Sequence, residues 1–269
     1  MALDVFFIFS ILIAGGIAGF ASGLFGIGGG VVLVPVLIVI FEHFGNPEIS
    51  THTAICTSLA IIIPNALISS IKQIQANNLD LALFKRWMIG LLIGIVIGAL
   101  LMLTLSGIVL KILFLCLLIF SLFSLFGNDK KTNGLTRVTT AKLTIGSTVI
   151  AAFSVLLGVG GGTFTVPYCK KILRLPIKKA IAISSLSGLF IGTGGTIIAT
   201  ITGLVHDTPT ILWSLGYLNW IVVILVLPTS LWLTPKGVMY SHKLSEKAIK
   251  YLFILLLCLC ILIMLVKIF

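Results

Sequence analysis

Two glycine-rich motifs are the residues of this sequence most able to do chemistry. The first covers residues 26–35 and reads GIGGGVVLVP, and the second covers residues 158–167 and reads GVGGGTFTVP. Because glycine inside a helix costs about 1 kcal/mol relative to alanine, each cluster predicts a break in a helix. The chain then restarts as a helix at about residues 29–31 and 161–163, and the free N–H groups at a helix start attract an anion. Two such helix starts facing each other would bind a small oxyanion without any buried lysine or arginine.

Short polar side chains inside apolar segments are the next candidates for the same site. Thr57-Ser58 and Ser184-Ser185 are paired hydroxyls, and Asn65 is an amide at the depth of a membrane segment. A hydroxyl in a helix donates either to an anion or to the carbonyl four residues earlier, and the sequence leaves both alternatives open. Residues 193–196, which read TGGT, predict an interruption of their helix that lines the same cavity.

Together these residue patterns predict a set of substrate-binding residues and two helix-breaking prolines. The substrate-binding residues are Gly26, Gly28, Gly29, Gly30, Thr57, Ser58, Asn65, Gly158, Gly160, Gly161, Gly162, Ser184 and Ser185, and the helix breakers are Pro35 and Pro167. Glycine also has a purely structural use, because small residues four apart let helices pack closely in a membrane. We predict that use for Gly15/Gly19/Gly23, Gly90/Gly94/Gly98 and Gly188/Gly192. The density of glycine, the proline and the duplication favour a role in substrate binding or gating for the two motifs.

Enzymatic chemistry has no support in the sequence. Neither glycine motif fits GxGxxG or is followed by GK[ST], and the sequence contains no HExxH, no GxSxG and no paired carboxylates at membrane depth. The five cysteines form no CxxC pair and are interpreted as small buried hydrophobic residues. Apart from Asp4 at the start of the first, no Asp or Glu lies inside a predicted membrane segment, which argues against a cation pump. We therefore expect no catalytic residue, no metal and no cofactor.

The composition places the chain in a membrane. Hydrophobic residues make up 59% of its 269 residues and charged residues 9%, with a mean hydropathy of +1.25. A soluble domain is nearer a quarter charged, so lipid must be the solvent. Because the apolar segments lack the alternation of barrel strands, they are predicted to be helices. The net charge of +11 comes from lysines and arginines between the segments, which is typical of membrane loops and argues against a nucleic-acid partner.

The chain is predicted to be an internal duplication. Ten apolar segments are expected, at 4–22, 30–41, 50–71, 84–104, 108–126, 140–157, 163–174, 180–203, 212–233 and 247–268. Three matches occur in the same order in both halves: the glycine motifs at an offset of 158 − 26 = 132, Thr57 with Ser184 at 184 − 57 = 127, and Leu105 with Leu244 at 244 − 105 = 139. The first transmembrane repeat is therefore assigned to residues 1–127, a polar linker to 128–138 and the second repeat to 139–269.

The charges of equivalent loops predict that the repeats have opposite orientations. The segment after the first glycine motif carries Glu42 and Glu48 but no Lys or Arg, whereas its counterpart has five basic residues between Lys170 and Lys179. Since Lys and Arg mark cytoplasmic loops, this loop and the one between Lys236 and Lys247 are predicted to be cytoplasmic. The expected fold is an all-α polytopic membrane protein of two inverted repeats, each with three full transmembrane helices and one glycine-broken helical hairpin. Two thin crossings in place of each hairpin remain an alternative.

The duplicated signature resembles that of a known family. The pattern G-x-G-G-G-x-x-x-V-P, followed by TSL at 57–59, SSL at 184–186 and LGYLN at 215–219, is similar to the TauE/SafE family of sulfite and organosulfonate exporters. The likeness extends from about Ile13 to Val266. It implies about eight spans in a bacterial or archaeal inner membrane and a substrate such as sulfite, sulfoacetate or thiosulfate.

The leading hypothesis is a secondary transporter of small sulfur-containing anions that works by alternating access. An anion-selective channel for small oxyanions is the alternative, because nothing in the sequence separates a gated pore from a carrier. The expected partners are a small anionic substrate and the lipid bilayer, and the sequence gives no oligomeric state.

Overall fold

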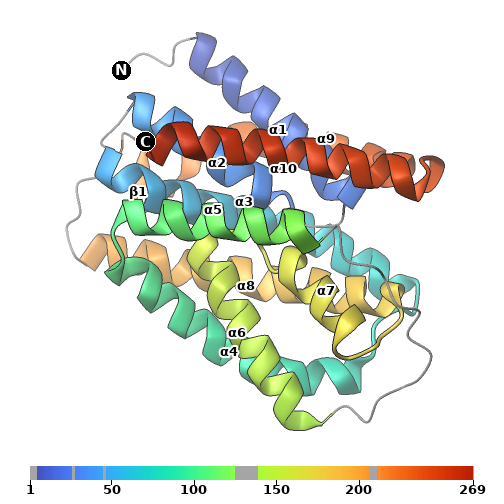
Figure 1. Ribbon diagram of the computed structural model, residues 1–269. Helices are drawn as coiled ribbons and strands as arrows, with labels where there is room; N and C mark the ends of the chain where they lie inside the picture. The colour runs from blue at the N-terminus through green and yellow to red at the C-terminus, as the bar shows by residue number, and fades with distance from the viewer. Residues whose placement is uncertain are drawn as a thin grey trace.

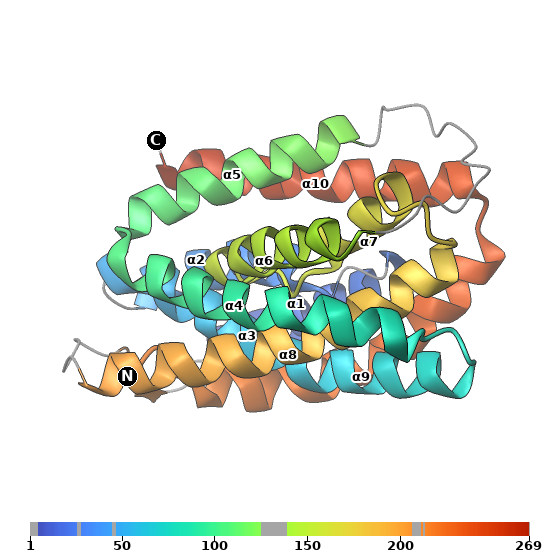
Figure 2. The same cartoon turned by 90° about the horizontal axis from the view of Figure 1, so that it is seen from below.

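Figures 1 and 2 show the computed structural model, which describes residues 5–25, 28–44, 47–124, 139–205, 211 and 213–268. These residues form ten α-helices and one short β-hairpin. In chain order the elements are α1 (Val5–Phe25), α2 (Gly30–Phe44), α3 (Pro47–Gln75), α4 (Leu81–Thr104), α5 (Gly107–Ser124), α6 (Thr140–Leu157), α7 (Gly162–Lys171), α8 (Ile177–Val205), β1 (Ser214–Leu215), β2 (Leu218–Asn219), α9 (Trp220–Lys243) and α10 (Glu246–Ile268). The predicted linker at 128–138 lies outside the described residues.

Seven of the described helices are long and apolar enough to cross a membrane, namely α1, α3, α4, α6, α8, α9 and α10. The helices α2 and α5 are apolar but shorter. Large apolar side chains such as Phe120, Phe123 and Leu255 point outward from the helices. Lipid is the solvent that suits such a surface, because water would be unfavourable for contiguous apolar side chains. The prediction of an all-α polytopic membrane protein is confirmed.

The start of α9 differs from the predicted segment 212–233. The chain first forms a hairpin in which Ser214–Leu215 pairs antiparallel with Leu218–Asn219. The helix begins after Asn219, because the Oδ1 of this residue caps it by accepting a hydrogen bond from the Val222 amide at 3.1 Å. It then continues beyond Lys236, so this lysine lies on a helix and not in the predicted loop.

Helices of the two predicted repeats pack against each other. Helix α1 packs along α9, and α4 packs along α6, so each half contributes one helix to either pair. A Cβ on Gly19 would collide with the Ser230 carbonyl, and a Cβ on Gly94 would collide with the Thr148 carbonyl. The packing role predicted for these two glycine sets is confirmed, since the backbones meet where a side chain is missing.

Helices α3 and α8, which hold equivalent places in the two halves, form the central pair and run antiparallel. Ser69 near the end of α3 lies 2.8 Å from Ser185 near the start of α8. Cys56 near the start of α3 lies 3.9 Å from Thr200 near the end of α8. Helices α5 and α10 also pack against each other. Exchanging the two halves therefore converts the α1–α9 pair into the α6–α4 pair and leaves the α3–α8 and α5–α10 pairs unchanged. An inverted repeat requires such a pattern, and the orientation of the halves in a membrane stays a prediction.

Each glycine break is the tip of a helical hairpin. Helix α2 runs back from the first break toward the end of the molecule at which α1 starts (Figure 1). Helix α7 runs back from the second break toward the start of α6 (Figure 2). The prolines are not the breaks, because Pro35 lies inside α2 and Pro167 inside α7. Their assignment as helix breakers is wrong: glycine already makes the turn, and neighbouring helices in a membrane satisfy the carbonyl that a proline leaves free.

Basic side chains gather at one end of the molecule. Figure 2 shows the α3–α4, α7–α8 and α9–α10 connections at this end and the α4–α5 connection at the other. Lys72 lies on the last turn of α3 and Lys178 on the first turn of α8. Lys179 lies 3.8 Å from Asp80, which links the start of α8 to the start of α4. We call this end the basic end; the charge bias predicts that it faces the cytoplasm.

Candidate functional site

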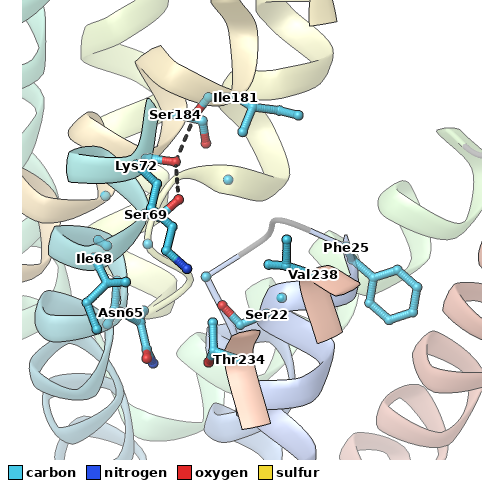
Figure 3. Close-up of a pocket in the computed structure, with 18 of the residues that line it drawn as sticks. Ser22, Phe25, Asn65, Ile68, Ser69, Lys72, Ile181, Ser184, Thr234 and Val238 are labelled. Carbon is cyan, nitrogen blue, oxygen red and sulfur yellow. Dashed lines mark hydrogen bonds between the residues drawn. The ribbon is translucent and has the colours of Figure 1, made fainter. Parts of the chain in front are cut away.

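A cavity of about 350 Å³ lies where the two hairpin tips meet α3, α8 and α9. Figure 3 shows its wall, which α3 lines from Ile62 to Gln73 and α8 lines with its first turns. Exposure along α3 shows where the cavity opens: Ile62 is 1% exposed and Asn65 4%, whereas Lys72 is an exposed residue. The cavity therefore opens toward the basic end and closes near the middle of the molecule.

Both glycine breaks contribute backbone to the cavity wall. Gly28, Gly160 and Gly162 line the cavity. Gly28 has a φ of +76° and Gly160 a φ of +66°, a left-handed conformation that residues with a Cβ rarely adopt. The breaks also touch each other, because a Cβ on Gly30 would collide with the Gly158 carbonyl. The two motifs thus face each other as predicted, at a distance that only glycine allows.

Each break ends in a helix start at the predicted position. Helices α2 and α7 begin one residue after Gly29 and Gly161. The Gly161 carbonyl accepts hydrogen bonds from the amides of Phe164 and Thr165, at 3.2 and 2.8 Å, and the Gly29 carbonyl does the same in α2. The first amides of each helix have no acceptor within their own helix. Together with the positive end of the helix dipole, these amides favour an anion.

Hydroxyl groups also line the cavity. Ser184 and Ser185 of α8 both line it. The Ser185 hydroxyl donates to the Ile181 carbonyl, four residues earlier, at 2.9 Å, and it also lies 2.8 Å from the Ser69 Oγ. Ser185 thus bonds back to its own helix and lines the cavity at the same time. Thr234 of α9 adds a hydroxyl that the sequence alone did not single out. The wall can therefore reorient several O–H groups toward an anion.

Asn65 of α3 is a buried residue that lines the cavity. Its Nδ2 donates to the Ser230 Oγ at 3.0 Å and to the Ile61 carbonyl at 3.3 Å. Its Oδ1 has no partner among the described residues. A buried acceptor without a partner costs about 1–3 kcal/mol, so this oxygen needs a donor from a bound water or a substrate.

The charged residue of the cavity is Lys72, which sequence reasoning missed. The apolar segment 50–71 predicts a loop at this position, but α3 continues to Gln75 and places Lys72 on the cavity wall. Figure 3 shows its side chain in the space between Ser69 and Ser22. Within the described part of the chain its ammonium group forms no ion pair, and no residue lining the cavity is acidic. Steps of three and four residues from Asn65 to Ser69 and Lys72 are the signal that places all three on one helix face.

Comparison with known families identifies the group to which the chain is related. The model of the sulfite exporter TauE/SafE family matches residues 11–264. The chain belongs to the TauE/SafE family. The resemblance carried by the glycine signature is therefore confirmed over nearly the whole chain.

Similar proteins in three organisms have names of one class. A "Probable membrane transporter protein" of Haemophilus influenzae is 30% identical over 257 residues, which cover 93% of this chain and 95% of the relative. One of Methanocaldococcus jannaschii is 27% identical over 248 residues, covering 89% and 88%. The probable membrane transporter protein YunE of Bacillus subtilis is 25% identical over 261 residues, covering 89% and 90%. No solved structure matches the chain significantly.

The family membership and the helices together give the class of this TauE/SafE protein. Seven long apolar helices in a chain of a transporter family make it an integral membrane protein. Its class of activity is membrane transport, as the family and the names of the relatives indicate.

Some of the predicted binding residues make contacts within the protein and do not line the cavity. The Thr57 Oγ1 accepts a hydrogen bond from the Asn219 amide at 3.2 Å, and the Ser58 hydroxyl donates to the Gly158 carbonyl at 2.9 Å. The glycines that form the turns and close contacts around the cavity without lining it are Gly29, Gly30, Gly158 and Gly161. Gly26 lies outside the described residues.

Residues 193–196 do not interrupt their helix. Helix α8 is continuous from Ile177 to Val205, and none of these four residues lines the cavity. The prediction of an interruption is wrong because both glycines serve packing. A Cβ on Gly194 would lie 2.8 Å from the Ile95 Cγ2, and a Cβ on Gly195 would lie 2.8 Å from the Leu59 Cδ1.

A buried ion cluster lies away from the cavity, toward the end opposite the basic end. Helix α2 extends to Phe44, so Glu42 lies in a helix and not in the predicted loop, with its side chain 10% exposed. Its Oε1 pairs with the Lys111 Nζ of α5, and its Oε2 lies 3.0 Å from the Lys267 Nζ of α10. Apart from Asp4, the predicted segments contain no carboxylate, but α2 as it folds contains Glu42.

We expect Glu42→Gln to destabilise the protein. The change leaves Lys111 and Lys267 without their carboxylate, and breaking a buried ion pair from one side costs about 3–5 kcal/mol. The melting temperature in detergent should fall clearly below that of the wild type. The double variant Glu42→Gln/Lys111→Met should recover part of the loss, because it removes both charges of the most buried pair. An unchanged melting temperature for Glu42→Gln would contradict the prediction.

Proposed function

We propose that this protein is a secondary transporter that carries small sulfur-containing anions, such as sulfite, thiosulfate or an organosulfonate, by alternating access. The composition of the cavity carries the proposal. Backbone from both glycine breaks, hydroxyls of α3 and α8 and the ammonium group of Lys72 line it, and none of its lining residues is acidic. An anion in this cavity would meet donors from both halves of the chain. The proposal includes no chemical change of the substrate.

Oxyanions suit these donors better than spherical ions do. An oxyanion has several equivalent oxygens, which can accept hydrogen bonds from a helix start, a serine hydroxyl and a lysine at the same time. A volume of about 350 Å³ is at the lower end of the range for pockets that hold small molecules, and it leaves room for water around an anion of a few atoms. The choice of sulfur rests on the family, whose model describes a sulfite exporter.

The closed half of the molecule favours a carrier over a channel. Beyond Ile62 the cavity ends, and the side chains of α3 between Thr51 and Ile61 are buried. A channel needs a continuous wet path, whereas a carrier needs a cavity that opens to one side at a time. An anion in the cavity could therefore leave toward the other end only after a conformational change.

Counterflow in proteoliposomes tests the proposal. Vesicles loaded with unlabelled thiosulfate, sulfite, sulfate, sulfoacetate or taurine are diluted into a trace of the same labelled compound. We expect saturable uptake that is faster when the same anion is inside, for at least one sulfur oxyanion or organosulfonate. Protein-free vesicles are the control. An ohmic single-channel conductance would replace the carrier by the anion channel, and uptake of none of these compounds would refute the substrate class.

A further inference from the structure

The two repeats assign an equivalent residue to each residue that lines the cavity on α3 and α8. The offset of 184 − 57 = 127 assigns to each residue of α3 from Ser50 onward an equivalent residue of α8, which we call its mate. By this rule the mate of Ser69 is Thr196, and the mate of Ser185 is Ser58. Because α3 and α8 run antiparallel, mates lie on opposite sides of their crossing point. Ser58 and Ser69 are 69 − 58 = 11 residues apart, which is about 16 Å along a helix.

The mates of two cavity hydroxyls are buried without hydrogen-bond partners. Thr196 is 8% exposed, and its Oγ1 has no partner in the described part of the chain. Ser154, the mate of Ser22 at the glycine-motif offset of 132, is 0% exposed, and its Oγ also has no partner there. A buried hydroxyl without a partner is unfavourable, because it has lost its hydrogen bonds to water. Ser22 and Ser69, in contrast, line the open cavity.

The contacts that close the other half of the molecule involve small side chains or none. A Cβ on Gly192 would lie 2.9 Å from the Leu59 carbonyl, and the Cys56 Sγ lies 3.9 Å from the Thr200 Oγ1. Gly192 and Thr200 are the mates of Asn65 and Gln73, which line the cavity. The closed contacts thus occupy the places that correspond to the open wall. Gly28 and Gly160 are mates of each other, so the deep end of the cavity lies where the halves meet.

We infer that the hydroxyls of Thr196 and Ser154 line a second half of the transport path, which opens away from the basic end when the present cavity closes. The inference rests on the alternating access proposed above. It explains why unpaired hydroxyls lie in a dry interface, since water and the anion reach them in the other state. The second half has no positive charge equivalent to Lys72, because the mate of Lys72 is Ala199.

Labelling of single cysteines tests this path without any transport measurement. The five native cysteines are replaced by alanine, and Thr196→Cys, Ser154→Cys or Ser69→Cys is added. A membrane-impermeant maleimide is applied to oriented vesicles from either side. We expect Ser69→Cys to react only from the basic end and Thr196→Cys and Ser154→Cys only from the opposite end. If the cysteine-free protein does not fold, the same changes are made in the native chain, with the native chain as background.

Ala151→Cys is the matched control, because Ala151 is as buried as Ser154 but its mate, Gly19, does not line the cavity. It should not react from either side. Reaction of Thr196→Cys and Ser154→Cys no faster than that of Ala151→Cys, or from the basic end only, would overturn the inferred path. Labelling as expected without counterflow of any sulfur anion would keep the path and refute only the substrate. Counterflow of a sulfur anion together with unreactive Thr196→Cys and Ser154→Cys would keep the proposed substrate and refute the path.

Discussion

Gly28→Leu is expected to abolish transport while the protein still inserts into the membrane. Gly28 lines the cavity and has a φ of +76°, so a leucine there is strained and places four side-chain carbons where the anion is proposed to bind. The same result is expected for Gly160→Leu, whose Cβ alone would lie 2.9 Å from the Ile62 Cδ1. The initial rate of anion uptake into proteoliposomes measures the loss. A single symmetric peak in size-exclusion chromatography verifies folding.

Gly28→Ala separates backbone strain from filling of the cavity. Both substitutions carry the same strain, which is about 1–2 kcal/mol for a residue with a Cβ in the left-handed region. The alanine Cβ has room, because its nearest neighbour would be the Val159 carbonyl at 3.9 Å. We therefore expect Gly28→Ala to keep a measurable part of the uptake. Wild-type rates for Gly28→Leu would refute the proposed site, and equal loss in both variants would assign the effect to strain.

Lys72→Gln is expected to raise the KM for the anion about tenfold, because a charge-assisted hydrogen bond contributes about 1.5–3 kcal/mol and 1.4 kcal/mol is a factor of ten. The lower end of that range applies since Lys72 is an exposed residue in contact with water. The effect should be larger for an anion that enters from the basic end, because Ala199 offers no charge on the other side. Lys72→Arg should keep most of the affinity. Uptake at a series of substrate concentrations gives the KM.

Lys85→Gln is the control for Lys72→Gln. Lys85 is an exposed residue on α4 near the same end of the molecule, and it does not line the cavity. Its removal changes the general surface potential by the same unit charge, which salt screens over about 10 Å at 0.1 M. The KM of Lys85→Gln should therefore stay close to that of the wild type. A tenfold rise in both variants would show that the surface charge, and not the cavity, attracts the anion.

The packing also suggests which parts would move together in the proposed cycle. Glycine lets α1 and α9, and likewise α4 and α6, approach with their backbones in contact, and such pairs resist sliding. The closed contact between α3 and α8 has no ion pair in the described residues. The buried hydroxyls of Thr196 and Ser154, which have no partner in the described part of the chain, lie close to it. Opening at α3 and α8 would therefore disrupt fewer favourable contacts than separating either glycine-packed pair.

Local chemistry explains which features could be predicted. The glycine breaks at Gly28–Gly30 and Gly160–Gly162 follow from the backbone freedom of glycine, so α2 and α7 begin where the sequence predicts. Errors occur where a neighbour decides. The glycines of residues 193–196 pack against Ile95 and Leu59, so α8 does not break. Asn219 caps α9 after a hairpin that the apolar run does not reveal.

By itself the sequence determined the solvent, the helical class and the positions of the two breaks, because hydrophobicity and glycine content act within one segment. Only the tertiary structure decided which polar residues face the cavity. Thr57-Ser58 and Ser184-Ser185 are equivalent in sequence, yet the first pair is sealed against Asn219 and Gly158 and the second lines the cavity. Lys72 lies on the cavity wall and Glu42 in the buried ion cluster because α3 and α2 continue past their apolar runs. Contacts between segments far apart in the chain set these helix ends and this choice of open side, and no local pattern encodes them.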